Sequence, residues 1–114
     1  MGSPSKAKRP KRRWVGICFF QQMKRDRIES LIEEIFPSSS TRLFDLISID
    51  HCRDITIEFD SSVVMFGIVR VNLSELDNFV SKCEGDSRLL TVTTSGKIRL
   101  VRERLGIDRP KVRR

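Results

Sequence analysis

The sequence lacks the apolar segments that would place it in or across a membrane. No run approaches the roughly 18 apolar residues that a membrane-spanning helix needs. The basic start of the chain also has no apolar stretch as long as that of a secretory signal. We therefore expect a soluble, intracellular protein with no membrane contact. Its 114 residues, 39% of them hydrophobic and 32% charged, suit one domain with a modest core.

Cysteine and histidine are too scarce to indicate a disulfide framework or a metal site. Cys18, Cys52 and Cys83 are odd in number and lie 34 and 31 residues apart, so we expect reduced, partly buried thiols. The single histidine, His51, adjoins Cys52. Neighbours on an extended chain point to opposite faces, which favours a polar turn over a Cys–His nucleophile pair. No local motif supplies the two further ligands that a metal bound here would need.

Sequence motifs for catalysis and for cofactor binding are missing too. Neither phosphate-binding glycine pattern, GxGxxG or GxxxxGK followed by Ser or Thr, occurs. Glu33 and Glu34 fall on the solvated face of a predicted helix, where acid–base chemistry is not favoured. The nearest match is TSGK at residues 94–97, a Ser-Gly turn that can hold a phosphate or simply cap a helix. We predict no catalytic residue, no cofactor and no metal, and hence a protein that is not an enzyme by itself.

Positive charge is abundant, and it gathers at the two ends of the chain. Residues 1–13 carry six basic groups and no acid, and residues 97–114 carry eight basic and two acidic groups. Residues 14–96 have a net charge of −5, within a total of +7. Basic ends favour a polyanion as partner, because each lysine or arginine that neutralises a phosphate releases condensed counterions. The segment KAKRPKRR also resembles a nuclear localisation signal or a solubilising tail, which is compatible with that interpretation.

The spacing of apolar residues predicts the order of helices and strands. Residues 14–20 are apolar on both faces, as in a strand covered on both sides. Apolar residues then recur at helical intervals until Pro37 ends the helix. Residues 54–59 alternate between apolar and polar, which predicts a strand in a hairpin with the next one. The expected elements are strands at 14–20, 54–59, 63–71 and 88–94, a further segment at 42–49, and helices from Met23 to Pro37, from Asn72 or Ser74 to Gly85, and at 97–105.

Small and polar residues predict local details. Asn72 and Ser74 are candidate N-caps, and Ser74 with Asp77 resembles a capping box. Gly67 inside a strand indicates a bulge or a close backbone approach. Gly106 is expected to cap the last helix.

Together these elements predict an α+β sandwich, with one mostly antiparallel sheet and two helices on one of its faces. The other face is left for the C-terminal basic helix or for a partner. We expect a disordered basic arm at 1–12, a single domain at 13–106 and a basic tail at 107–114.

The element order invites comparison with the RNA-recognition module, but the aromatic signature of that module is absent. Strand 63–71 offers Phe66 as its one aromatic residue, so base-specific recognition by the sheet is not expected. Trp14 follows Arg12 and Arg13, and we interpret it either as a base-stacking residue or as the core anchor of its strand.

Motifs in the C-terminal half resemble a known family. GIVRV at 67–71, a helix containing Phe79, and LLTVTTSGKIRLVRERLG at 89–106 are similar to the small protein subunits of ribonuclease P and ribonuclease MRP, of the processing-of-precursor type. In that family an apolar strand ending in arginine precedes a helix, a strand, a Ser-Gly-basic turn and a basic helix. A basic pair leading into a strand at Trp14 is similar as well, so the resemblance covers about residues 12–106.

The resemblance implies a non-catalytic, RNA-binding subunit of a ribonucleoprotein whose RNA processes precursor tRNA at the 5′ end, or precursor rRNA in the MRP form. It implies a split RNA-recognition-like, or ferredoxin-like, fold and a location in the nucleus and nucleolus. The implied partners are the structured catalytic RNA, a TIM-barrel-like subunit and a sibling of the same family. By position, Arg70 corresponds to the strand-ending arginine, and residues 95–99 to the turn and the start of the helix.

The charge at the two ends of the chain, with Arg70 added by the resemblance, predicts a set of RNA-binding residues. Three of them, Lys97, Arg99 and Arg102, are expected to contact phosphates from the last helix. The full set is Lys8, Arg9, Lys11, Arg12, Arg13, Arg70, Lys97, Arg99 and Arg102. An alternative function is a protein–protein adaptor whose basic tail targets the nucleus. A third is a dimer that binds single-stranded nucleic acid on its own.

Overall fold

The computed structural model describes residues 11–107. Its strands are β1 (Arg12–Phe19), β2 (Arg42–Ser48), β3 (Met65–Asn72) and β4 (Leu89–Ser95), and its α-helices are α1 (Arg25–Ile35), α2 (Leu76–Glu84) and α3 (Ile98–Leu105). Short 3-10 turns follow β2 at Ile49–His51 and β3 at Leu73–Glu75. Most of the expected basic arm and C-terminal tail lies outside the described residues, although Arg12 already belongs to β1. No helix between residues 11 and 107 has the length and apolar character needed to cross a membrane.

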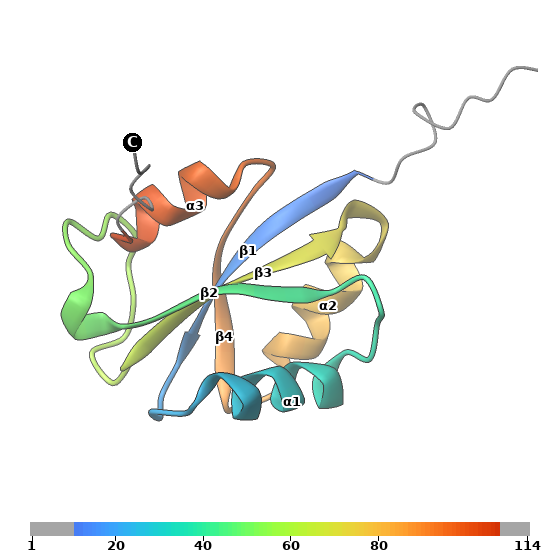
Figure 1. Ribbon diagram of the computed structural model, residues 1–114, viewed down its shortest axis with the longest axis horizontal. Helices are drawn as coiled ribbons and strands as arrows, with labels where there is room; N and C mark the ends of the chain where they lie inside the picture. Colours follow the sequence, from blue (N-terminus) through green and yellow to red (C-terminus); the bar gives the residue numbers. More distant parts are fainter. Residues whose placement is uncertain (1–10, 108–114) are drawn as a thin grey trace, which may run out of the picture.

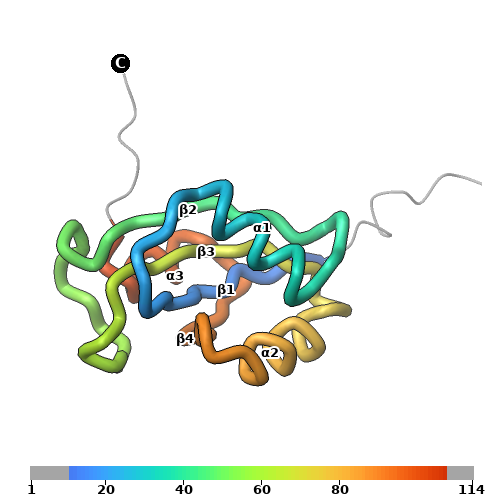
Figure 2. Tube along the Cα trace, turned by 90° about the horizontal axis from the view of Figure 1, so that it is seen from below, coloured from blue at the N-terminus to red at the C-terminus, as the bar shows by residue number. Residues whose placement is uncertain are grey.

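The four strands form one antiparallel sheet in the order β2-β3-β1-β4 (Figures 1 and 2). Helix α1 connects β1 to β2 across β3, and α2 connects β3 to β4 across β1. This arrangement is compatible with a ferredoxin-like fold. The predicted α+β class with an antiparallel sheet is confirmed.

Helices cover both faces of the sheet, and each face has its own hydrophobic cluster. On one face Ile28 of α1 and Phe79 of α2 pack with Val15 of β1. On the other face Val101 and Leu105 of α3 pack in a second cluster, together with Cys18 and Phe66 of the sheet. Figure 1 shows α1 and α2 below the sheet and α3 above it. The predicted pair of helices on one face is confirmed, and the C-terminal helix lies on the other.

Helix α3 approaches β1 closely because position 16 is glycine. A Cβ atom on Gly16 would lie 2.8 Å from Cγ2 of Thr93, 3.2 Å from Leu105 and 3.3 Å from Val101. The contact with Thr93 of β4 would be shorter than real Cβ contacts and those with Leu105 and Val101 would be unusually tight, so a larger residue would force the strand or the helix to shift.

Gly67 in β3 marks a close approach, which is one of the two explanations that the sequence left open. A Cβ atom there would lie 3.2 Å from Cε2 of Phe19 and 3.4 Å from the carbonyl oxygen of Asp45. The irregularity in the β2–β3 pairing lies in β2 instead. The register shifts there between Leu43 and Asp45, and Phe44 is the extra residue.

The predicted strand at 54–59, and its hairpin with residues 63–71, are wrong. The segment is an irregular connection, and β3 pairs with β2 and β1. Asp54 has a left-handed backbone with φ of 57°, which interrupts extended geometry. The turn expected after residue 59 does form, because the carboxylate of Asp60 accepts hydrogen bonds from the N–H and hydroxyl of Ser62.

The connection at residues 53–64, which we call the strap, is bound to the C-terminal end of α3. The N–H of Arg53 donates to the carbonyl of Gly106 at 2.9 Å, and the N–H of Thr56 donates to the carbonyl of Arg104 at 3.0 Å. Ile55 and Ile57 of the strap pack against the cluster beneath α3. The alternating pattern of this segment therefore reflects one buried side of a loop.

Two of the predicted helix caps are confirmed and two are wrong. Gly85 ends α2 and Gly106 ends α3. Neither Asn72 nor Ser74 caps α2 through its side chain, and the box with Asp77 does not form. The reason is that a 3-10 turn comes first, so the helix begins at Leu76 with Glu75 before it.

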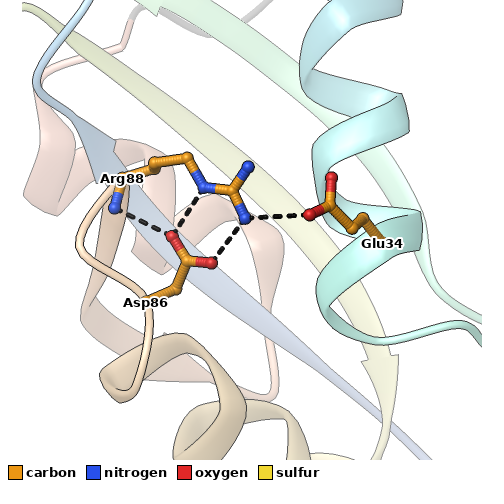
Figure 3. A network of polar contacts seen from close by, with 3 residues as sticks. All are labelled: Glu34, Asp86 and Arg88. Atoms are coloured by element: carbon orange, nitrogen blue, oxygen red, sulfur yellow. Dashed lines mark hydrogen bonds and ion pairs between the residues drawn. The ribbon is translucent and has the colours of Figure 1, made fainter.

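An ion-pair network joins α1 to the turn before β4 (Figure 3). Nη2 of Arg88 donates to Asp86 at 2.7 Å and to Glu34 at 3.2 Å. The backbone N–H and Nε of Arg88 also donate to Asp86, both at 2.9 Å. These hydrogen bonds lower the pKa of Asp86 to about 2.

Gly106→Ala should destabilise the protein far more than Gly85→Ala, although both glycines end helices. Gly106 has φ of 75°, and a Cβ there would overlap the backbone carbonyl of Arg53 in the strap. At Gly85 the nearest atoms would be 3.7 Å away. In urea unfolding we expect a loss of about 2 kcal/mol or more for Gly106→Ala and a change below about 1 kcal/mol for Gly85→Ala. Equal effects would contradict the contact between the strap and α3.

The carboxylate of Asp86 should stabilise the protein at neutral pH, and this stabilisation should be lost in acid. Its folded-state pKa is about 2 against an ordinary 3.8, so the unfolded chain binds this proton more readily than the folded chain. The stabilisation is complete above about pH 4 and is lost as the pH falls through the folded pKa. We expect Asp86→Asn to flatten the dependence of unfolding free energy on pH in this range. Asp77→Asn, at an exposed position of α2, is the control and should leave the dependence unchanged.

Candidate nucleic-acid interface

The antiparallel sheet brings parts of all four strands together at one end. Arg42 of β2 lies opposite Arg70 of β3, Arg70 lies opposite Trp14 of β1, and Trp14 lies opposite Ser95 of β4. Directly opposed residues of antiparallel strands share a face, so these four side chains form one row across the sheet. Figure 1 shows β1 entering and β3 leaving the sheet side by side at this end.

The row lies on the same face as α3 but beyond the helix. Trp14 packs at the margin of the cluster beneath α3, whereas the helix contacts β1 at Gly16, two residues further along. Arg12 precedes Trp14 by two residues and so shares its face. With Phe44, these residues form what we call the basic aromatic patch, which consists of Arg12, Trp14, Arg42, Phe44 and Arg70. The side chains of the patch are exposed or partly exposed.

Three guanidinium groups of the patch crowd together without a carboxylate. Burial, and then the positive charges of Arg12 and Arg42, lower the pKa of Arg70. Within residues 11–107 none of the three arginines forms an ion pair, and the buried Nε of Arg70 has no hydrogen-bond acceptor. Like charges held this close repel one another, so an anion bound between them would relieve the repulsion.

Two aromatic rings lie among these arginines. The rings of Trp14 and Phe44 meet edge to face, with centroids 4.8 Å apart and an angle of 84°. The guanidinium carbon of Arg70 lies 5.3 Å from the centroid of Phe44, within cation–π range. The Phe44 side chain, on the bulged part of β2, is nevertheless 36% exposed. Trp14 therefore packs at the rim of the core, beside a ring that faces solvent.

The turn between β4 and α3 adds further positive charge near the row. The hydroxyl of Ser95 accepts the N–H of Lys97 at 3.1 Å, which forms the predicted Ser-Gly turn. Lys97 and Arg99 are exposed, and neither forms an ion pair within the described residues. Arg13 reaches toward the turn, since a Cβ on Gly96 would lie 3.5 Å from its Nη1. Phosphate binding by this turn stays a prediction.

Arg102, for which a phosphate contact is predicted, is held in an ion pair within the fold. Its Nε and Nη2 donate to the carboxylate of Asp45 at 2.6 Å and 3.1 Å, and both side chains are 18% exposed. The hydrogen bonds to Asp45 raise the pKa of Arg102. Because this pair links α3 to β2, Arg102 holds the helix over the sheet. Arg104 is similarly occupied, since it donates to the hydroxyl of Thr93 and to the carbonyl of Thr94.

The structure describes only some of the RNA-binding residues that are predicted at the start of the chain. Lys11 is exposed and leads into β1, and its carbonyl accepts the N–H of Leu73 at 2.8 Å. Lys8 and Arg9, which the sequence also predicts to bind RNA, lie outside the described residues.

Sequence reasoning does not identify Arg42 or Phe44. Arg42 stands apart from the basic ends of the chain, and its importance follows from the strand register that sets it opposite Arg70. The alternation of Arg42, Leu43 and Phe44 is the one sequence signal that would have placed Phe44 beside Arg42.

The described residues offer little for covalent or metal chemistry. The three cysteines are free thiols, two of them buried. Burial raises the pKa of Cys18 and Cys52, and raises that of Cys83 to about 12, so the reactive thiolate is scarce at neutral pH. Between residues 11 and 107 no group of three or more histidine, cysteine or acidic side chains is placed to hold a metal ion. The patch can attract anions and stack against flat groups.

Comparison with known proteins adds no assignment to this geometry. A scan against models of protein families finds none that matches the chain, and a search of curated proteins finds no significant match.

Proposed function

We propose that the protein is a non-catalytic, RNA-binding subunit of a ribonucleoprotein of the ribonuclease P or ribonuclease MRP type. The observation that carries this proposal is the crowding of Arg12, Arg42 and Arg70 at one end of the sheet without a carboxylate partner in residues 11–107. A folded protein gains nothing in stability from three unpaired guanidinium groups held together. Phosphates of an RNA backbone would supply the missing negative charge.

The distribution of acidic groups supports one orientation toward the RNA. Helix α1 carries Glu29, Glu33 and Glu34 on its exposed side, and it packs on the opposite face of the sheet from the patch. Asp45, the acidic residue near the patch, is already paired with Arg102. The exposed glutamates of α1 and the patch thus belong to opposite faces of the sheet, and the face that carries the patch is proposed to contact the RNA.

The motifs that resemble the ribonuclease P and MRP subunits fall in this region. GIVRV forms most of β3 and contains Arg70, and the Ser-Gly-basic turn leads into α3 beside Trp14. We propose that the sheet is an RNA-recognition-like variant in which α3 covers most of the surface that such modules use. Recognition then depends on backbone phosphates and shape, as arginine contacts favour.

The proposal includes the protein partners and location that the resemblance implies. A TIM-barrel-like subunit and a sibling of the same family would join the protein on the catalytic RNA, in the nucleus and nucleolus. Leu90 of β4, which is 41% exposed, is an apolar side chain available for protein contacts away from the patch.

Reversal of charge on the patch should weaken RNA binding. We expect the triple variant Arg12→Glu, Arg42→Glu, Lys97→Glu to bind an in vitro transcribed ribonuclease P RNA at least about tenfold more weakly, because phosphate contacts are lost. In filter binding, the slope of log affinity against log salt should fall by about 0.7 to 0.9 per contact removed. Arg70 and Arg102 are left intact because each packs against other side chains.

The control is a triple variant with the same change in charge on the other side of the molecule. Lys24, Arg27 and Lys82 are exposed on or beside α1 and α2, and their replacement by glutamate should leave most of the affinity intact. An equal loss in both triple variants would mean that net charge rather than the patch governs binding.

The identity of the RNA requires a separate experiment. We expect a tagged chain, isolated from cells after cross-linking, to enrich ribonuclease P or MRP RNA when the bound RNA is sequenced. Enrichment of unrelated RNA would contradict the family assignment. Protein partners that stay bound after a nuclease has digested all RNA, with no RNA enriched, would favour the adaptor function instead.

A further inference from the structure

We infer that the basic aromatic patch binds RNA in unpaired form, with a nucleobase stacked on the Trp14–Phe44 pair and the adjoining phosphates held by the neighbouring arginines. The inference rests on the proposed function, because it names the form of RNA that the same surface recognises. It goes beyond backbone contact, which treats paired and unpaired RNA alike.

The exposed aromatic surface is the first reason. Phosphate binding needs charge alone, yet Arg70 of the patch lies over Phe44, which is 36% exposed. An apolar ring in contact with water is unfavourable, and a nucleobase stacked on it would remove that surface from water. The faces of bases in a duplex are already covered by their neighbours, so an unpaired base fits better.

The relative position of the rings and charges is the second reason. Trp14 and Phe44 meet edge to face and do not stack in parallel. Each ring therefore keeps at least one face that the other ring does not cover. Arg70 lies over Phe44 and has Arg42 directly opposite it on the neighbouring strand. A base near the rings would therefore have two guanidinium groups within reach of its 5′ and 3′ phosphates. The buried Nε of Arg70 lacks an acceptor within the described residues, so no protein group competes for this cation on that side.

The position of α3 limits the length of RNA that can lie on the sheet. The helix contacts β1 at Gly16, two residues beyond Trp14, and covers the middle of this face. Apart from Leu90 on the edge strand β4, which is 41% exposed, the free part of this face is the end row of the sheet. A short unpaired segment, such as a bulge or a loop, suits this surface better than a long single strand that tracks across all strands.

The test uses the tryptophan itself, since Trp14 is the one tryptophan of the chain. A single-stranded adenylate RNA, a duplex RNA of equal length and polyglutamate of equal charge are each titrated into the full chain at low salt. We expect the single strand to quench and shift the emission of Trp14 and to bind more tightly than the duplex. Polyglutamate, which has charge but no bases, should bind without this spectral change.

Substitutions at two phenylalanines test whether binding of the single strand depends on the Phe44 ring. Phe44→Ala should weaken binding of the single strand by about 5- to 100-fold. Phe59→Ala removes a ring that is similarly exposed, at 38%, and that also meets another ring edge to face, but in the strap. It should leave affinity unchanged. Phe44→Leu keeps the apolar volume without a ring and should show the same loss, which holds the test open if the alanine variant is too unstable to measure.

The outcomes separate this inference from the proposed function. If single strand and duplex bind equally and neither changes the emission of Trp14, the stacking inference is overturned while RNA binding through phosphates stands. Stacking is also overturned if polyglutamate quenches the emission as strongly as the single strand does. If neither RNA binds even at low salt, the proposed function fails as well.

Discussion

The packing of α3 on β1 at Gly16 decides which part of the sheet remains open. A Cβ at this position would press against Val101 and Leu105, so glycine is what allows the helix to sit on the strand. The ion pair between Arg102 and Asp45 and the backbone hydrogen bonds of the strap fix the helix at two further places. With the middle of the face covered in this way, the end of the sheet where the arginines and aromatic rings meet stays open.

Two arginines on this face differ in whether a carboxylate within the described residues neutralises their charge. Arg102 is bidentate on a carboxylate, is largely buried, and joins two elements. Arg70 lies near the positive charges of Arg12 and Arg42, and its guanidinium group is within cation–π range of the Phe44 ring. Charge that is neutralised inside the fold contributes to holding it together, whereas charge left unneutralised is available to a partner. Charge counts along the sequence cannot tell these two cases apart.

Much of the fold was predictable because the apolar spacing is strong. The helix around Ile28, the strand after Trp14 and the glycine ends at Gly85 and Gly106 follow from local rules. The strap was misassigned because burial of one side of a loop gives the same alternation as a strand. For the candidate interface, the basic ends of the chain pointed to Arg12 and the family resemblance pointed to Arg70, whereas neither pointed to Arg42. Its role depends on strand register and on the extra residue in β2, which are properties of the pairing rather than of any single segment.

The strap also affects how the protein opens locally. Two of its backbone N–H groups, those of Arg53 and Thr56, donate to carbonyls at the end of α3, so this irregular segment depends on that helix for part of its stability. The amide hydrogens of Arg53 and Thr56 can exchange with solvent when the end of α3 separates from them. We therefore expect the strap and the end of α3 to open together as one cooperative unit. The amide hydrogens of Arg53 and Thr56 should then exchange slowly, as those of helices and strands do.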